Sequence, residues 1–159
     1  MKHSSLILFI LIICTSALTA QKKKEIKKNR IKSITVTETS SGITINDNKT
    51  TYNSNGEIVE EINYNKKGEV KYIKKYSYNS SGDLIEETEW SGDNVLQNKK
   101  TYKYNALGEK TEENHFDSAG KLSKKEVFTY NKNGLKFDKK TYDASGKLIS
   151  TKKYTYQVK

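Results

Sequence analysis

The stretch YNSNGEIVEEINYNKKGEVKYIKKYSY, from Tyr52 to Tyr78, decides the fold because it contains one complete repeat of 26 residues. Its tyrosine returns at the same interval along the chain, at Tyr52, Tyr78, Tyr104, Tyr130 and Tyr156. Two further aromatic ladders have this period: Tyr64, Trp90, Phe116 and Tyr142, and Tyr76, Tyr102, Phe128 and Tyr154. Of the 15 aromatic residues after residue 20, 13 lie on these ladders, and such self-similarity predicts a repeat architecture.

Each repeat contains two turn signals, in which Asn or Asp is followed three residues later by glycine. The Asx side chain accepts hydrogen bonds from the following backbone, and the glycine supplies the positive φ of a three-residue hairpin loop. Asn94 replaces glycine once, and asparagine is the next most tolerant residue of that backbone conformation. The predicted turn glycines are Gly56, Gly68, Gly82, Gly108, Gly120, Gly134 and Gly146.

The runs between the turns, such as residues 57–64 and 69–78, have the length of strands and are too short for typical helices. Short turns join antiparallel neighbours. The sequence therefore predicts an all-β domain over residues 31–156, an antiparallel meander of five double-strand repeats that forms one twisted, curled sheet. The alternative is a β-solenoid with one repeat per coil.

The turn also predicts a register, because a bulged loop that closes at Asn65 and Glu69 places Tyr64 opposite Val70. Counting outward by strict alternation places all 13 ladder aromatics on one face of the sheet. The pairs predicted in this way are Tyr64–Val70, Ile62–Tyr72, Glu60–Lys74, Ile58–Tyr76, Tyr78–Leu84, Tyr72–Trp90, Glu86–Lys100, Glu112–Glu126 and Asp138–Lys152.

Charge follows the repeat, since the shorter runs carry paired glutamates and the longer runs carry paired lysines. Alternating acidic and basic strands favour the correct neighbours and keep sheet edges soluble. The whole chain has 29 basic and 19 acidic residues, for a net charge of +10. Arg30 is the sole arginine, whereas sites for phosphate or base recognition favour arginine. Together with the secretory signal pattern of residues 1–20, this argues against nucleic acid as a partner.

Residues 1–20 have the basic start, short apolar run and small-residue end of a secretory signal peptide, with cleavage expected after Ala20. The apolar run is too short for a transmembrane helix. A lipoprotein would require acylation of Cys14, but the preceding residues lack the small side chain expected there. We expect a secreted, periplasmic or cell-surface protein. Residues 21–30 then form either a solvated basic tether or a contact with anionic lipid head groups or acidic glycan.

The sequence does not indicate an enzyme, a metal site or a cofactor. His115 is the only histidine after residue 20, and no cysteine follows the signal segment, so zinc sites and nucleophile pairs with histidine are disfavoured. We expect His115 to face solvent on a strand. Glutamate pairs recur in three successive repeats, whereas a glycosidase needs one catalytic pair. The turns lack the oxygen ligands of a calcium loop.

The aromatic residues are the candidates for ligand binding. Large exposed apolar patches mark partner sites, and tyrosines flanked by Lys and Asn suit glycans. The alternative is that these rings are the protein's own core or a self-association surface. The candidate partners are anionic glycan, peptidoglycan or another envelope protein. The candidate binding residues are Tyr64, Tyr76, Trp90, Tyr102, Phe116, Phe128, Tyr142 and Tyr154.

Tyr-Asn or Tyr-Asp followed by two residues and glycine, between short strands, resembles the YD (RHS-like) repeats of bacterial secreted and surface proteins. The motif begins here at Tyr52, Tyr64, Tyr78, Tyr104, Tyr130 and Tyr142, with a variant at Phe116. The resemblance covers about four fifths of the chain. It implies a curling strip of antiparallel hairpins and a secreted or surface location, and it does not specify an activity.

Overall fold

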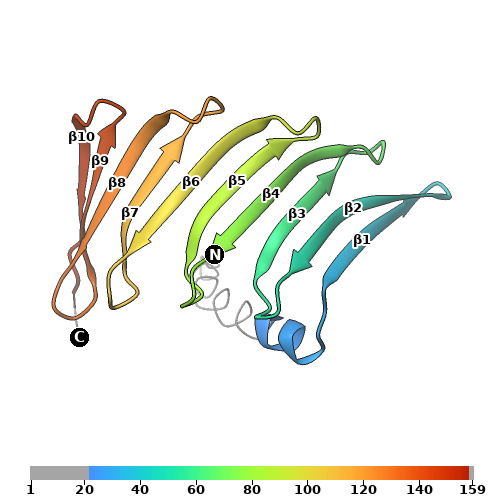
Figure 1. Cartoon of the computed structure of the whole chain (residues 1–159), viewed down its shortest axis with the longest axis horizontal. Helices are drawn as coiled ribbons and strands as arrows, with labels where there is room; N and C mark the ends of the chain where they lie inside the picture. Colours follow the sequence, from blue (N-terminus) through green and yellow to red (C-terminus); the bar gives the residue numbers. More distant parts are fainter. Residues whose placement is uncertain (1–21, 158–159) are drawn as a thin grey trace, which may run out of the picture.

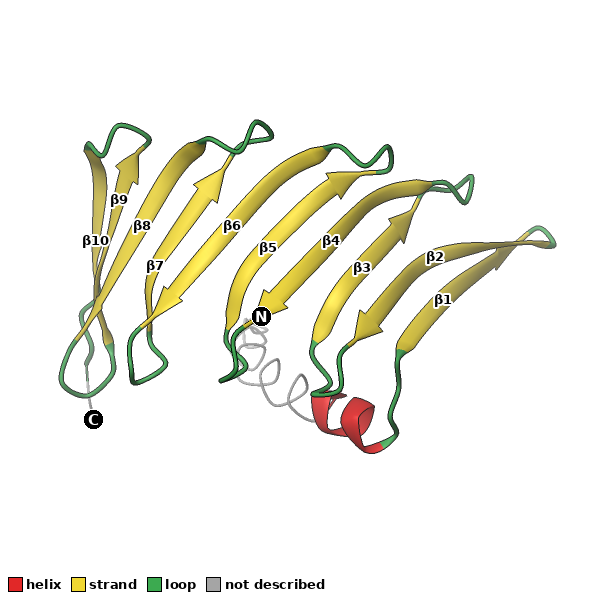
Figure 2. Cartoon of the chain, viewed as in Figure 1, coloured by secondary structure: helices red, strands yellow, loops and turns green. Residues whose placement is uncertain are grey.

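The computed structural model describes residues 22–157 as a single open sheet of ten strands, in which every strand pairs with its neighbours in sequence (Figures 1 and 2). All pairs are antiparallel, so the predicted meander is confirmed and the solenoid alternative is wrong. The strands are β1 (Ser33–Ser40), β2 (Ile43–Tyr52), β3 (Ile58–Tyr64), β4 (Val70–Tyr78), β5 (Leu84–Ser91), β6 (Leu96–Tyr104), β7 (Lys110–Phe116), β8 (Leu122–Tyr130), β9 (Lys136–Asp143) and β10 (Leu148–Lys153).

The turns have the predicted chemistry, which the loop between β4 and β5 illustrates. The Asn79 side-chain Oδ1 accepts hydrogen bonds from the backbone amides of Ser81 at 3.0 Å and Asp83 at 2.9 Å. Gly82 follows with a φ of 85°, and its amide donates to the Asn79 carbonyl. All seven predicted turn glycines have φ between 73° and 85°, and Asn94 adopts 62° in the place of glycine. The local turn predictions are therefore confirmed.

The predicted register is correct only for the first pair beside each turn, because every hairpin from β2 onward contains a β-bulge in addition to the bulged loop of its turn. Tyr64 pairs with Val70 as predicted, but the next pair is Asn63 with Tyr72, so Lys71 is an extra residue. Such a β-bulge shifts all later pairs of the hairpin by one residue. From β2 onward, the extra residues recur with the period of the repeat, at Val59, Lys71, Ile85, Gln97, Thr111, Ser123, Phe137 and Ile149.

The predicted pairs beyond each bulge are consequently wrong. The structure pairs Ile62 with Ile73 and Trp90 with Ile73, where Tyr72 was expected for both. Tyr76 pairs with Glu87 and does not lie opposite Ile58. The charged pairs are each displaced by one residue as well: Glu61–Lys74, Glu60–Lys75, Glu87–Lys100, Glu113–Glu126 and Asp138–Lys153 replace the predicted set.

The prediction that all ladder aromatics share one face is wrong for the same reason. Side chains alternate between the two faces of a strand, so one extra residue transfers every later side chain to the other face. The pairing places one ladder on one face, namely Tyr64, Trp90, Phe116 and Tyr142. The other two ladders lie on the opposite face.

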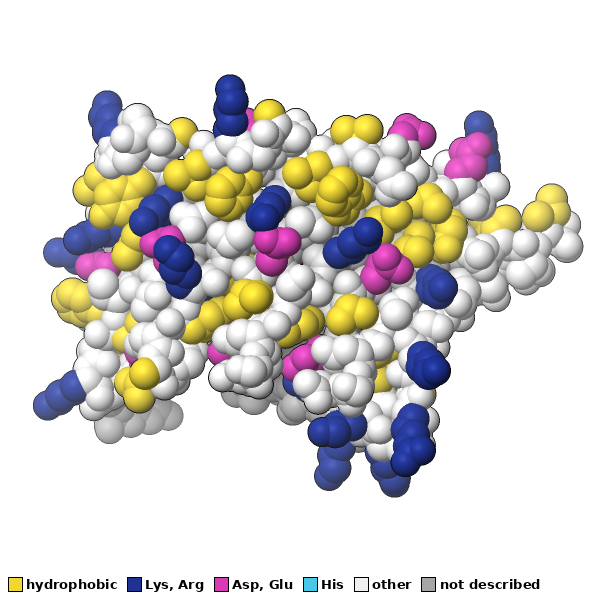
Figure 3. All heavy atoms as spheres, viewed as in Figure 1, with side chains coloured by type: hydrophobic (Ala, Val, Ile, Leu, Met, Phe, Trp, Pro, Cys, Tyr) yellow, Lys and Arg dark blue, Asp and Glu magenta, His cyan; other side chains and the backbone are white. Residues whose placement is uncertain are grey.

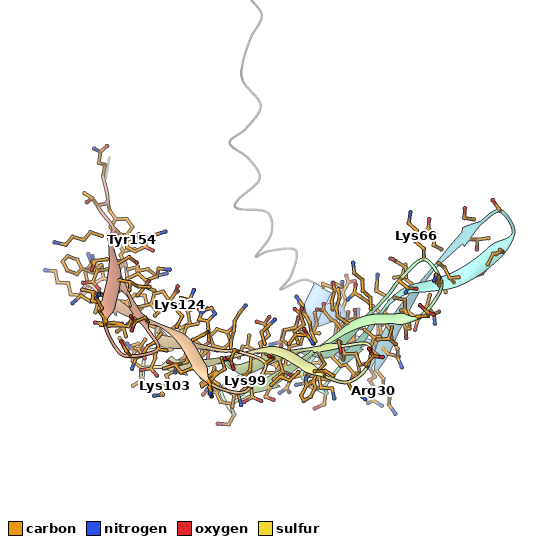
Figure 4. The ribbon with its side chains drawn as sticks, turned by 90° about the horizontal axis from the view of Figure 1, so that it is seen from above. Arg30, Lys66, Lys99, Lys103, Lys124 and Tyr154 are labelled. Carbon is orange, nitrogen blue, oxygen red and sulfur yellow. The ribbon has the colours of Figure 1, made fainter. Side chains whose placement is uncertain are left out.

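The sheet is a curved single layer, and the two faces can be told apart in Figure 4. Lys124 and Tyr154 lie on its hollow side, whereas Lys103 lies on its outer side. The outer face therefore carries the Tyr64 ladder, and the hollow face carries the other two. No second layer of described residues covers either face. Accordingly, few apolar side chains among residues 22–157 are buried, and they are Ile26, Tyr52 and Phe128.

A ladder of tyrosine hydroxyls binds adjacent strands at the margin where β2 ends. Tyr78 donates to the Ile58 carbonyl at 2.8 Å, and Tyr104 donates to the Leu84 carbonyl at 2.9 Å. Tyr130 and Tyr156 repeat the contact with the residues 20 positions before them. The sheet has no thick core. Each of these tyrosine rings instead covers part of the sheet margin, while its hydroxyl donates a hydrogen bond to a backbone carbonyl.

The segment considered as a basic tether contains a helix over residues 22–28, which lies against the margin of β1 to β3 (Figure 2). Ile26 is only 3% exposed, and the Lys23 amine lies 2.9 Å from Glu57 Oε1. The helix backbone also approaches Gly56 so closely that a Cβ there would lie 2.6 Å from the Lys23 carbonyl oxygen. The signal segment and Cys14 lie outside the described residues. Within those residues, no helix has the length and apolarity needed to cross a membrane.

Candidate functional site

The outer aromatic row, defined as Tyr64, Trp90, Phe116 and Tyr142, forms a regular apolar stripe. Each ring pairs across its hairpin with an aliphatic residue, Val70, Leu96, Leu122 or Leu148 respectively. The upper line of apolar clusters in Figure 3 follows these hairpins on the outer face. Equivalent rings are two strands apart, which corresponds to about 10 Å at the usual spacing between strands. The stripe can therefore contact an extended polymer at regular intervals.

Trp90 is oriented within this row by its neighbours. Its indole Nε1 donates a 2.9 Å hydrogen bond to Thr88 Oγ1, and Thr88 is buried. The Lys75 amine lies 5.7 Å from the centre of the indole ring. Fixed rings lose little conformational entropy when a ligand stacks on them, and the adjacent ammonium adds a hydrogen-bond donor.

The inner aromatic row, defined as Tyr76, Tyr102, Phe128 and Tyr154, has a different environment. Tyr76 donates to Glu61 Oε2 at 2.6 Å, and Tyr102 donates to Glu87 Oε2 at 2.9 Å. Burial, reinforced by the hydrogen bond to the glutamate, raises the pKa of both phenols well above the usual value. These hydroxyls are therefore used within the sheet.

Lysines lie between the later rings of the inner row. The Lys110 amine lies 5.2 Å from the Tyr102 ring centre and 4.9 Å from that of Phe128. Lys136 continues the series at 4.9 Å from Phe128 and 5.6 Å from Tyr154. Phe128 is 5% exposed as a result. Cation–π contacts therefore hold Tyr102 and Phe128 within the sheet, whereas Tyr154 at the end of the row is exposed.

Many lysines of the strands form ion pairs with carboxylates. On the outer face, Glu112 lies 2.9 Å from the Lys103 amine and 2.8 Å from the Lys125 amine. Burial alone would raise the pKa of Glu112, but hydrogen bonds from Lys125, Lys103 and Asn114 outweigh it and lower the pKa to about 2. On the inner face, Glu126 is held in the same way between Lys124 and Lys139. The lysines thus tie neighbouring strands together.

Glu113, His115 and Glu126 form a cluster on the inner face that the predicted register did not bring together. Their ligand atoms lie within 4.8 Å of one another. His115 Nε2 lies 2.9 Å from Glu113 Oε1, yet within the described residues it lacks an aligned hydrogen bond. Lys110, Lys124 and Lys139 already neutralise the two carboxylates, which disfavours a bound cation.

The environment of His115 differs from the solvent-facing position that the sequence predicts, because its side chain is only 21% exposed. Burial, together with the charge of Lys124, lowers its pKa and favours the neutral imidazole. Sequence analysis missed this cluster because the pairing of Glu113 with Glu126 depends on the bulge at Ser123.

No protein-family model and no curated protein matches the chain. Solved structures that are similar to it include TcdB2-TccC3-Cdc42, with 14% sequence identity, a TM-score of 0.46 and coverage of 75% of this chain and 8% of that one. A protein of unknown function from Bacteroides fragilis has 15% identity and a TM-score of 0.43, with coverage of 80% and 96%. A porin-like protein from Bacteroides uniformis has 17% identity and a TM-score of 0.39, with coverage of 76% and 49%.

The chain thus spans less than a tenth of the TcdB2-TccC3-Cdc42 chain and nearly all of the Bacteroides fragilis chain. Membership of the YD family stays a prediction, and these similarities assign no function to the chain.

Proposed function

We propose that this protein is a non-enzymatic, exported repeat module that binds extended glycan chains of the cell envelope along its outer aromatic row. The observation that carries the proposal is the row of four rings on the outer face, repeated at intervals of about 10 Å. Sugar rings present apolar faces that stack on aromatic side chains, and a linear glycan repeats these faces at regular intervals. Export is inferred from the signal-like residues 1–20.

The inner row supports this choice by contrast. Tyr76 and Tyr102 use their hydroxyls within the sheet, and Lys110 and Lys136 occupy the spaces beside the later rings. The eight candidate residues therefore divide into four that line a proposed glycan-binding surface and four on the hollow face, of which Tyr76, Tyr102 and Phe128 are engaged within the sheet and Tyr154 is exposed. Lysines at the border of the outer row, such as Lys75, favour glycans that carry hydroxyl or carboxylate groups.

A pull-down with insoluble peptidoglycan and with soluble oligosaccharides, over a series of salt concentrations, tests the proposal. We expect binding that persists at high salt and that the double substitution Trp90→Ala with Phe116→Ala reduces by about tenfold or more. Phe137→Ala is the matched control, because Phe137 is an exposed aromatic residue at a bulge outside both rows. Absence of binding to any glycan at low salt would overturn the proposal, as would an equal loss in the control.

A second candidate function is association with another protein, and the sheet edge at β10 favours it. Among the described residues β10 has one neighbour, β9, and its outer edge presents unpaired backbone groups, which can accept a further strand. Leu148, Ile149 and Tyr156 are exposed there. Sedimentation velocity across a concentration series, with and without oligosaccharide, distinguishes the two functions. Association without glycan binding would favour this alternative.

A further inference from the structure

A hollow of about 670 Å³ lies between the N-terminal helix (residues 22–28) and the margin of β2, outside both aromatic rows. Its apolar lining comes from Ile26, Ile31 and Tyr52, and two of these side chains are among the few that the fold buries. A volume of this size falls within the roughly 300–1,000 Å³ that small-molecule sites occupy. The hollow is therefore large enough for a ligand and offers it an apolar surface.

Three cationic residues, Lys27, Arg30 and Lys32, also line this hollow. All three are exposed, whereas the helix residue Lys23 is turned to Glu57. Residues 22–32 contain seven cationic side chains and one carboxylate, that of Glu25, and this basic cluster occupies one corner of the molecule in Figure 3. An apolar surface bordered by cations is complementary to a molecule with an apolar tail and an anionic head group.

Arg30 is held at this position by the end of the helix. The Ile31 amide donates to the Ile26 carbonyl at 3.0 Å, and the Arg30 amide donates to the Lys27 carbonyl at 3.2 Å. These two bonds form a Schellman motif, in which the residue at the position of Arg30 is usually glycine. Arg30 accordingly has a φ of 51°. The sole arginine of the chain thus occupies a backbone position that glycine adopts more readily.

From this geometry we propose that the hollow binds an amphiphile with a single anionic head group. The tail lies on Ile26, Ile31 and Tyr52, and the guanidinium of Arg30 binds the head group together with the amines of Lys27 and Lys32. Guanidinium binds carboxylate and phosphate oxygens through two parallel hydrogen bonds, so either group satisfies the site. The ligand class is therefore an alkyl carboxylate or an alkyl phosphate, as in a free fatty acid or a phospholipid.

Amide NMR spectra of the full chain, titrated at physiological salt, test this proposal with resolution at the site. The probes are octanoate, octyl phosphate and octyl glucoside, each below its micellar concentration, and inorganic phosphate. We expect octanoate or octyl phosphate to shift the amides of Ile26, Arg30 and Tyr52 with saturation. Whichever of these two probes binds with the higher affinity identifies the preferred head group. Equal binding of octyl glucoside or of inorganic phosphate would overturn the proposal, because the neutral probe lacks the charge and the phosphate lacks the tail.

Arg30→Gly separates binding from folding, because glycine suits the positive φ at this position and preserves the helix end. We expect the variant to retain its thermal midpoint or to raise it, and to lose about tenfold in affinity for the anionic amphiphile. Lys28→Gln is the matched control, since it removes one charge from the same helix at a residue outside the hollow. A loss in the control as large as in Arg30→Gly would show general electrostatic attraction and overturn the proposal.

Discussion

The hydroxyl of Tyr76 donates a 2.6 Å hydrogen bond to Glu61, and the bond recurs one repeat later between Tyr102 and Glu87. In the third repeat the ring is Phe128, which has no hydroxyl. The equivalent glutamate, Glu113, is there bound by the Lys110 amine at 2.6 Å. Lysine at residue 110 replaces the Leu84 of the preceding repeat, so the lost hydroxyl is compensated by a cation. The repeats thus satisfy the same carboxylate position in two chemical ways.

Replacing Tyr76 with Phe should destabilise the protein by about 1–2 kcal/mol, because the Glu61 carboxylate loses its donor within the sheet. Urea unfolding at neutral pH measures this change in the free energy of unfolding. Tyr72→Phe is the control, since no hydrogen bond of the Tyr72 hydroxyl is found within the described residues. Equal destabilisation in both variants would show that the Tyr76–Glu61 bond has no specific role.

The ion pairs of Glu112 predict a loss of stability in acid. The folded pKa of Glu112 is lowered to about 2 from an ordinary value of 4.5, so the unfolded chain takes up the proton first as pH falls. The stabilisation is therefore complete above about pH 4.5 and is lost as the pH falls toward 2. Glu112→Gln should cost about 1–2 kcal/mol at pH 7 and should reduce the slope of stability against pH in that window.

Glu60→Gln is the matched control for Glu112→Gln. Glu60 occupies the equivalent position two repeats earlier and forms no ion pair with another described residue. Denaturant unfolding at a series of pH values between 2 and 7 provides the measurement. An unchanged acid slope in Glu112→Gln would contradict the assignment of the lowered pKa to this residue.

His115 predicts a second pH dependence, at a higher pH. Burial, with the charge of Lys124, lowers its pKa, while Glu113 and Glu126 oppose this effect and Lys100 adds to it. The unfolded histidine therefore binds its proton at a higher pH than the folded one, and stability falls as pH drops below about 6.5. His115→Asn, which copies Asn63 of an earlier repeat, should remove this decrease while leaving stability above pH 7 similar. A parallel pH profile in both proteins would contradict the prediction.

Two glycine substitutions separate backbone strain from steric overlap. Gly120→Ala should cost about 1 kcal/mol, because Gly120 has a φ of 75° but has open space where the added methyl group would lie. Gly92→Ala should cost more, about 2–3 kcal/mol, because its methyl group would overlap the Val70 carbonyl oxygen of the preceding hairpin. Thermal unfolding of the two variants, side by side, gives the comparison. A larger loss for Gly120→Ala would show that the hairpins move apart readily.

The candidate site could be predicted from the sequence in part. All eight proposed aromatic residues belong to regular rows, because the period of the repeat places equivalent side chains in equivalent environments. The sequence did not divide them between the outer and inner rows. The helix over residues 22–28 was also missed, since a lysine-rich segment with Ile26 as its single apolar side chain has no helical periodicity to detect.

The sequence by itself determined the strand segments and the turns that join them, because this information is local, and it favoured the meander over the solenoid. An Asx side chain binds the amides two and four residues later, and a glycine such as Gly82 supplies the positive φ. Only the tertiary structure decided which side chains share a face. The bulged residues include Lys71, Ile85 and Ser123, which have no chemical property in common, so no residue type marks a bulge. Their position results from the pairing of strands, and each one reverses the face of every side chain that follows it in the hairpin.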